Sequence, residues 1–162
     1  MRGSGIVLAF TLMTAAAVAQ PAAQAVKTYS SSSDIATLIA KAKSDRKGDA
    51  PIVTEPILRL APYNANLEYR AAVGAAAIHE KEAEIFYVID GSGTLVTGGK
   101  LIKESRTNAE NLTGTGIEGG TARPVAKGDF IIVPENTAHW FSSINGTLVL
   151  MSMHVPRSAE TH

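Results

Sequence analysis

The feature that most constrains the fold of this chain is a succession of short apolar runs between turn residues, which extends from Pro56 to Val155. The runs are rich in β-branched and aromatic residues, and Gly, Asn, Asp and Pro interrupt them. This spacing is typical of antiparallel strands that form a sandwich or barrel. We predict strands at 56–61, 66–73, 75–79, 84–90, 93–100, 123–125, 129–133, 139–143 and 147–155. The polar stretch between Lys103 and Gly120 is too long for a tight hairpin, so we expect a surface excursion there.

One segment before these runs has a helical pattern instead. Apolar residues recur at helical spacing between Asp34 and Arg46, and Ser33 is a candidate N-cap. Gly48 and Pro51 end the pattern. We therefore predict a short N-terminal helical segment at 34–50, followed by a β-barrel domain at 51–158.

The first residues have the pattern of a secretory signal peptide. Arg2 precedes an apolar run, and the small residues Ala17-Val18-Ala19 form a cleavage site. The run is shorter than the roughly 20 apolar residues that a membrane span needs. We expect residues 1–19 to be removed, residues 20–33 to form a flexible leader, and the mature protein to be secreted or periplasmic and free of the membrane.

Composition limits the classes of partner and the means of stabilisation that we expect for this chain. Lys plus Arg and Asp plus Glu are balanced at 15 each, so nothing indicates a basic surface for nucleic acid. The 162 residues suit a single domain with a sizeable core. The chain has no cysteine, so an exported protein of this kind must rely on packing, helped by a metal or a second subunit. Asn-x-Thr sites at Asn111 and Asn145 matter only in a glycosylating host.

Two histidines and a carboxylate form a candidate metal site. His79 lies five positions before Glu84, at the start of one predicted strand, and His139 begins another. An inward-facing carboxylate is costly to bury without a partner. A divalent metal held by His79, Glu84 and His139 would remove that cost and leave coordination positions for a substrate. In the alternative, the histidines are ordinary hydrogen-bonded side chains and Glu84 pairs with Lys81 or Arg70.

Strand alternation then suggests the walls of a substrate pocket. If Glu84 faces the interior, Phe86 and Val88 face it too, and Phe141 shares a face with His139. Tyr69 and Arg70 lie on the preceding strand, where one of the two faces inward. His154, in the last predicted strand, is interpreted as a strand residue with a local partner, although it could also line the pocket.

The segments around these residues resemble the two motifs of the cupin superfamily. In the first motif a glutamate follows a His-x-His pair after three or four residues and is separated by six residues from a glycine, as Glu84 is from Gly91. His79 then occupies the second histidine position. In the second motif, the spacing of glycine, proline and histidine is matched by Gly128, Pro134 and His139.

Departures from the two motifs reduce the number of metal ligands that we expect. Ala77 stands at the first histidine position, Asn136 replaces the glycine of the second motif, and Ser143 replaces its final asparagine. A register with His79 first would place Lys81 second and also lose a histidine. The resemblance implies three ligands at most, unless Glu80, Glu82 or a residue outside the motifs supplies a fourth.

The resemblance implies an all-β fold, a single cupin-type jelly-roll barrel with one short N-terminal helix, and a homodimer. It leaves two classes of function open. The first is an exported small-molecule metalloenzyme of the dioxygenase, isomerase or lyase type, with Fe, Mn, Zn or Ni as cofactor and Glu84 as ligand or catalytic base. The second is a non-catalytic protein that binds a sugar or organic acid, with a structural metal or none.

Overall fold

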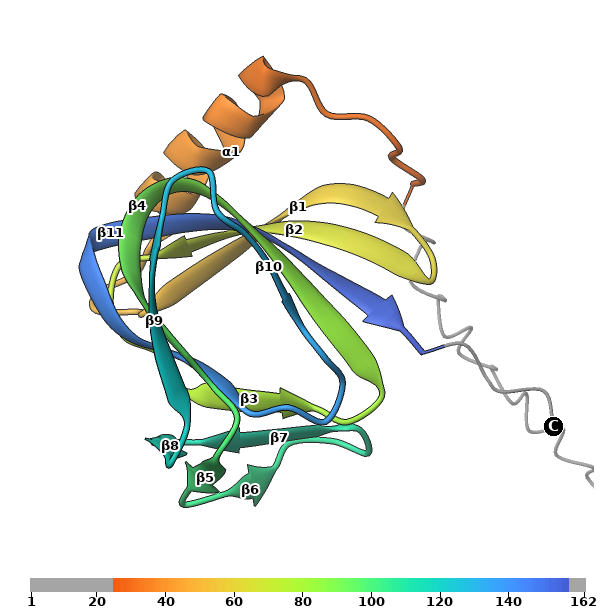
Figure 1. Cartoon of the computed structure of the whole chain (residues 1–162). Helices are drawn as coiled ribbons and strands as arrows, with labels where there is room; N and C mark the ends of the chain where they lie inside the picture. Colours follow the sequence, from red (N-terminus) through yellow and green to blue (C-terminus); the bar gives the residue numbers. More distant parts are fainter. Residues whose placement is uncertain (1–24, 158–162) are drawn as a thin grey trace, which may run out of the picture.

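The computed structural model describes residues 25–157 (Figure 1), so the predicted signal peptide and the start of the leader lie outside the described residues. Within that range the chain forms one α-helix followed by strands. The expected all-β jelly-roll architecture with a short N-terminal helix is confirmed. The elements are α1 (Ser32–Asp45), β1 (Ile52–Leu60), β2 (Tyr63–Arg70), β3 (Ala76–His79), β4 (Glu82–Thr97), β5 (Lys100–Ile102), β6 (Ser105–Arg106), β7 (Asn111–Gly114), β8 (Gly116–Glu118), β9 (Thr121–Ala126), β10 (Phe130–Val133) and β11 (His139–Pro156).

Two long strands pass through both halves of the barrel. β4 and β11 are antiparallel partners from Glu82↔Pro156 to Thr97↔His139. The end of this pair that contains Glu82 and Pro156 lies in one wall with β1, β2 and β10. The end that contains Thr97 and His139 lies in a second wall with β3 and β9. The sequence predicted a break in each strand, near Asp90 and Thr147. That prediction was wrong, because both strands continue through the bend, where their register shifts and residues 145–147 of β11 have no paired partner.

Gly91 shows how closely the two strands approach at the bend. Its φ is +84°, and a Cβ added there would lie 2.0 Å from the carbonyl oxygen of Thr147. Only glycine fits such a position. The turn signal that the sequence presents at Gly91 is therefore a bend inside one strand.

The stretch 103–120, predicted as a surface excursion, contains short strands. β7 pairs with β3, β6 pairs with β7, and β8 pairs with β5 in a separate two-stranded sheet. These strands lie on the opposite side of the barrel from α1 (Figure 1). Pairing of β7 with β3 places Asn111 directly opposite His79, so this segment reaches the candidate site.

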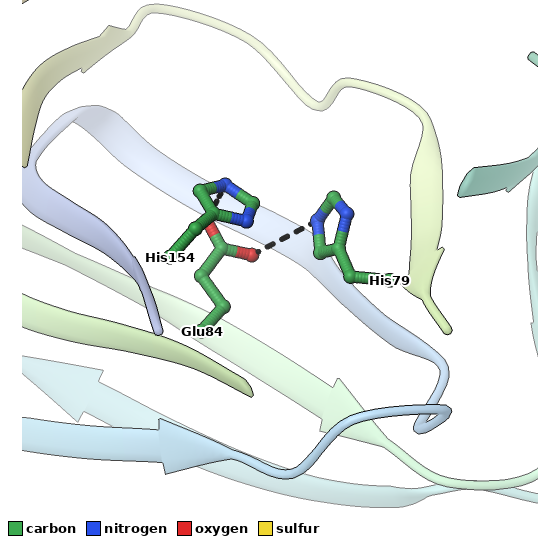
Figure 2. Close-up of side chains that lie close together, drawn as sticks. All are labelled: His79, Glu84 and His154. Carbon is green, nitrogen blue, oxygen red and sulfur yellow. Dashed lines mark ion pairs between the residues drawn. The ribbon is translucent and has the colours of Figure 1, made fainter. Parts of the chain in front are cut away.

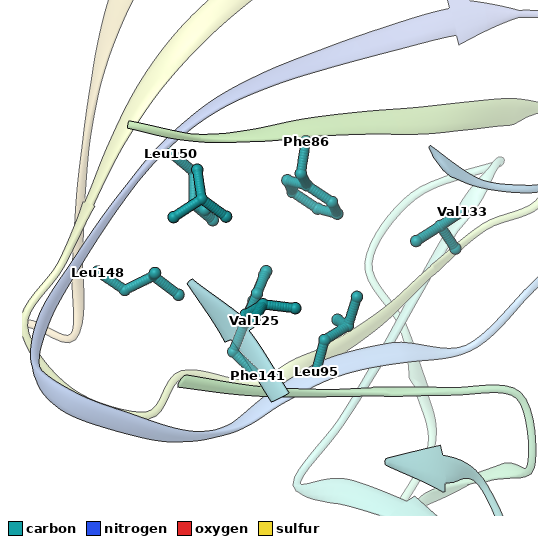
Figure 3. Packing of buried hydrophobic residues seen from close by; sticks show 8 residues of the cluster. Phe86, Leu95, Val125, Val133, Phe141, Leu148 and Leu150 are labelled. Carbon is teal, nitrogen blue, oxygen red and sulfur yellow. The ribbon is translucent and has the colours of Figure 1, made fainter. Parts of the chain in front are cut away.

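The hydrophobic core has two parts, separated by the wall that contains β2 and β11. The interior cluster fills the barrel (Figure 3) and comprises Phe86, Val88, Leu95, Val125, Val133, Phe141, Leu148 and Leu150. The outer cluster lies beneath α1 and comprises Ala42, Ile57, Ala65, Leu67, Tyr69 and Val149. Because successive strand side chains alternate, Leu67 and Tyr69 face the helix while Glu68 and Arg70 face the interior.

The N-cap of helix α1 lies two residues earlier in the chain than predicted. The N-cap is Ser31 rather than Ser33: its Oγ accepts a hydrogen bond of 3.1 Å from the amide of Asp34, whose carboxylate accepts one of 2.8 Å from the amide of Ser31. Before the helix, Lys27 and Arg59 exchange backbone hydrogen bonds of 2.9 and 2.8 Å. In residues 25–157, α1 is not long and apolar enough to cross a membrane.

Candidate metal centre

Three imidazoles converge on the buried carboxylate of Glu84, which is only 4% exposed. The Nε2 atoms of His79 and His139 lie 3.3 and 3.0 Å from its Oε2, and the Nε2 of His154 lies 3.5 Å from its Oε1. Figure 2 shows His79 and His154 approaching this carboxylate from different strands. The structure thus brings together the three ligands predicted from the sequence and adds a third histidine.

Strand register explains how these residues meet. His154 and Glu84 are direct cross-strand partners in β11 and β4. His139, at the other end of β11, is paired with Ala77 of β3, two residues before His79. The loop before β11 is also joined to the site, since the amide of Asn136 donates a 2.7 Å hydrogen bond to the carbonyl of His79. Asn136 adopts φ +56°, which explains how it can replace the motif glycine.

His154 is the site residue that sequence reasoning missed. Ligand atoms of His79, Glu84 and His154 all lie within 4.8 Å of one another, whereas His139 falls outside this group. The Nδ1 of His154 is buried and makes no hydrogen bond, although Glu82 Oε2 lies 3.1 Å away. Alternation from Leu148, Leu150 and Ser152 was the available signal, because it places His154 on the inner face.

Hydrogen bonds orient the rings of two histidines. The Nδ1 of His79 lies 2.6 Å from Oδ1 of Asn111, whose Nδ2 in turn donates a 3.0 Å hydrogen bond to Asn108. The Nδ1 of His139 lies 3.2 Å from the carbonyl of Thr137. Because the acceptors require a proton on each Nδ1, both rings turn Nε2 toward Glu84.

The electrostatics of the cluster follow from these contacts. Burial acts to raise the pKa of Glu84, but hydrogen bonds from His139 and His79 outweigh it and hold the pKa far below its ordinary value of 4.5. Burial acts to lower the pKa of His79, but its bonds to Glu84 and Asn111 outweigh that effect and raise the pKa above 6.5. Without a metal, the cluster therefore holds an ionised carboxylate beside a readily protonated imidazole.

The partners proposed in the alternative interpretation are engaged elsewhere. Lys81 lies 3.6 Å from Glu110, and Arg70 pairs with Glu68 at 2.6 Å. Glu80, considered as a fourth ligand, accepts two hydrogen bonds from Arg106. Glu82 contacts His154 rather than the centre of the cluster.

Four of the five predicted pocket residues face the barrel interior, and the fifth, Tyr69, faces α1. Phe86 and Phe141 lie edge to face with ring centroids 5.4 Å apart, and Phe86 is 6.0 Å from the ring of His139. Val88 is completely buried in the interior cluster. Arg70 faces the interior, with its guanidinium carbon 4.7 Å from the centre of the Phe141 ring. Tyr69 packs beneath α1, on the side away from the candidate metal ligands.

A jelly-roll barrel with imidazoles and a carboxylate in its interior defines a class of protein that commonly holds metals or small molecules. The family model described as Cupin matches residues 55–160. The chain therefore belongs to the cupin family. A comparison with curated proteins gives no match.

Solved structures support the fold. KdgF from Halomonas sp. is similar at 18% identity and a TM-score of 0.50, covering 69% of this chain and 86% of its own. The structure of FeII HppE is similar at 15% identity and a TM-score of 0.51, and the match covers 68% of this chain and 54% of that chain. At these identities the likeness shows the fold and does not transfer an activity.

The donor set fits a divalent metal. Three imidazole nitrogens and one carboxylate are ligands that Fe, Mn, Zn and Ni accept, and they can leave coordination positions free. The closely grouped donors of His79, Glu84 and His154 could hold such an ion. The hydrogen bonds on Nδ1 of His79 and His139 supply the outer support that metal-binding histidines usually have.

Proposed function

We propose that this cupin binds one divalent metal through His79, Glu84, His139 and His154 and acts as a metalloenzyme on a small molecule. The observation that carries the proposal is the convergence of three Nε2 atoms on one buried carboxylate, each within 3.5 Å. A cluster of this composition is costly to bury without a strong compensating charge. The similarity in fold to FeII HppE agrees with a bound metal but does not identify it.

The roles of the residues follow from their positions. A bound cation would supply Lewis acidity toward an oxygen atom of the substrate. His79 and His139 are held by their Nδ1 hydrogen bonds and present Nε2 as ligands. Glu84 is ionised in the metal-free cluster, so its carboxylate is available as a metal ligand. Its second candidate role is that of a base when it leaves the metal.

Metal analysis tests this proposal. Protein purified without chelator should carry close to one metal per chain, and His79→Ala, His139→Ala and His154→Ala should each lose most of it. Glu80→Gln is a matched control, since Glu80 pairs with Arg106 instead. A parent protein that stays metal-free after incubation with Fe, Mn, Zn and Ni would refute the site.

A turnover screen then separates the two classes of function. Metal-loaded parent protein should convert a member of a panel of organic acids, phenols and sugar acids, and Glu84→Gln should abolish turnover. Binding without turnover across the panel would instead favour the second class, a non-catalytic cupin that binds a sugar or organic acid.

Export and dimerisation are further parts of the proposal. The signal-peptide pattern ending at Ala19 supports secretion or transfer to the periplasm. N-terminal sequencing of the exported protein should begin at Gln20. Sedimentation should give twice the mass of one chain, and a species of one chain's mass at micromolar concentration would contradict the homodimer.

A further inference from the structure

An uncharged apolar face lies on the outside of the barrel, next to α1. The helix packs mainly on β1 and β2, so part of the outer side of β4 and β10 stays exposed. There β4 presents Ile85, Tyr87 and Ile89, since its alternate residues fill the interior. Phe130 and Ile132 of β10 lie on the same side, as cross-strand partners of these β4 residues.

Three large side chains of this face are open to solvent. Phe130 is 68% exposed, Ile132 is 62% exposed and Tyr87 is 40% exposed. The ring centroids of Phe130 and Tyr87 are 6.4 Å apart, so the exposed side chains form one patch. A large side chain has a surface of about 200 Å², so the three together expose roughly 300 Å². Contiguous apolar patches of this size are often functional.

The strand at one border of this face is unprotected. Among the described strands, β10 pairs with β4 alone. Edge strands of natural proteins commonly carry a charge, a proline or a bulge that prevents association, whereas β10 has the sequence Phe-Ile-Ile-Val. This edge and the apolar side chains beside it therefore favour contact with another chain.

A groove forms the other border of the same face. It has a volume of about 660 Å³ and lies between α1 and the sheet. Its walls include Ile35 and Ile39 of the helix, Tyr87 of β4 and Met151 of β11. In the part of the chain that the structure describes, none of the side chains that line this groove is charged. A charged group would be costly to place there, so the groove suits an apolar side chain.

The shape of the face is complementary to itself. Tyr87 lies between the exposed Phe130, its partner in β10, and the groove, whose wall it helps to form. A two-fold axis that passes close to Tyr87 would therefore place Phe130 of each copy over the groove of the other copy. Because the groove and β10 are both uncharged, such a contact would not oppose like charges.

We propose that this face binds a second copy of the chain, with Phe130 of each copy seated in the groove beside α1 of the other. The inference rests on the homodimer of the proposed function and adds the surface that forms it. Each partner of a stable dimer buries roughly 800 Å². The three exposed side chains would supply more than a third of that area, and the walls of the groove are available for the rest.

Sedimentation of purified protein tests this surface. The parent should be a dimer at micromolar concentration, and Phe130→Lys should weaken dimerisation about a hundredfold or more, because two-fold symmetry places the new charge in both grooves. Ile102→Lys is a matched control and should stay dimeric, since Ile102 of β5 is 43% exposed on the side of the barrel opposite α1 (Figure 1). Both variants should keep the circular dichroism spectrum of the parent.

Disulfide cross-linking keeps the test decisive if Phe130→Lys fails to fold, because the chain has no cysteine. Ala36 of α1 lines the groove. On oxidation the double variant Ala36→Cys/Phe130→Cys should therefore give a covalent dimer, whereas neither single variant should.

The outcomes separate this surface from the homodimer itself. A dimeric parent that Phe130→Lys leaves dimeric, or a double variant that does not cross-link, would overturn the surface and leave the homodimer standing. A parent that is monomeric at micromolar concentration would refute the homodimer and this inference with it. If that monomer bound an apolar fluorescent probe that Phe130→Lys released, the face would belong to a different partner.

Discussion

Nδ1 of His79 and Oδ1 of Asn111 are 2.6 Å apart, and this hydrogen bond joins a candidate ligand at the end of β3 to the first residue of β7. The contact allows a segment outside the two cupin motifs to support the candidate metal centre. Asn111 is itself restrained by Asn108. The ring of His79 is therefore oriented from the side of the barrel opposite α1.

Replacing Asn111 should weaken metal binding without removing a ligand. Asn111→Leu should lower zinc affinity about tenfold or more, because outer hydrogen bonds of this kind typically contribute that much. Asn111→Asp keeps an acceptor for Nδ1 and should retain most of the affinity. Asn145→Leu is the control, since Asn145 bonds Ser92 at the surface. Competition titration with a chromogenic chelator measures each value, and parent-like affinity in Asn111→Leu would contradict the role.

Restoring the missing motif histidine should compensate for loss of His154. Ala77 shares the inner face of β3 with His79 and is the β3 partner of His139. Ala77→His combined with His154→Ala should recover metal content that His154→Ala alone has lost. Elemental analysis of both variants measures this. A double variant as poor in metal as the single one would show that the two positions are not equivalent.

The pH dependence of stability should differ between metal-free and metal-bound protein. Because the pKa of Glu84 is lowered, its contribution is present above 4.5 and lost as pH falls through the folded pKa. Because the pKa of His79 is raised, its contribution is present below 6.5 and lost as pH rises through the folded pKa. In metal-free protein, this cluster should therefore contribute most to the free energy of unfolding between pH 4.5 and 6.5.

Thermal unfolding in chelator and in excess zinc checks this pattern. Zinc must displace protons from the histidines, so the stabilisation it gives should increase with pH. His79→Gln should remove the decline above pH 6.5 in chelator. A zinc effect independent of pH would argue against displacement of a proton from His79.

The bend of β4 supplies a test of the fold. Gly91→Ala should destabilise the protein by about 3 kcal/mol or more, because the new methyl group meets Thr147 and the backbone has positive φ. Gly146→Ala is matched in φ, at +76°, but has open space around the added Cβ. It should cost about 1 kcal/mol. Urea unfolding gives both values, and equal costs would contradict the close approach at Gly91.

The sequence predicted the barrel well because alternation and turn residues are local signals. It predicted separate strands before and after Gly91, where the structure has the single strand β4, because glycine is common both at turns and at bends within a strand. The distinction depends on Thr147, which is far along the chain and contacts Gly91 only after β11 has paired. The exact N-cap was missed for a smaller reason, since Ser31 and Ser33 are both suitable and the side chain of Asp34 selects between them.

The site was predictable only in part. The spacing around Glu84 and His139 is a motif, but His154 joins them through cross-strand register, which sequence spacing does not encode. The choice between Tyr69 and Arg70 depended likewise on α1, which covers the face that Tyr69 occupies. Asn111 had no signal as a site residue, because its pairing with His79 exists only once β7 has formed.

The same Asn111 begins the sequence Asn-Leu-Thr, and its amide nitrogen is the atom that an N-linked glycan would modify. That nitrogen holds Asn108 in the folded protein. Glycosylation takes place on the exported chain, so a host with this modification would place a bulky sugar beside β3 and displace the support of His79. If the chain is exported and binds a metal as proposed, a host that glycosylates Asn111 should therefore give protein with weaker metal binding than a host that leaves Asn111 unmodified.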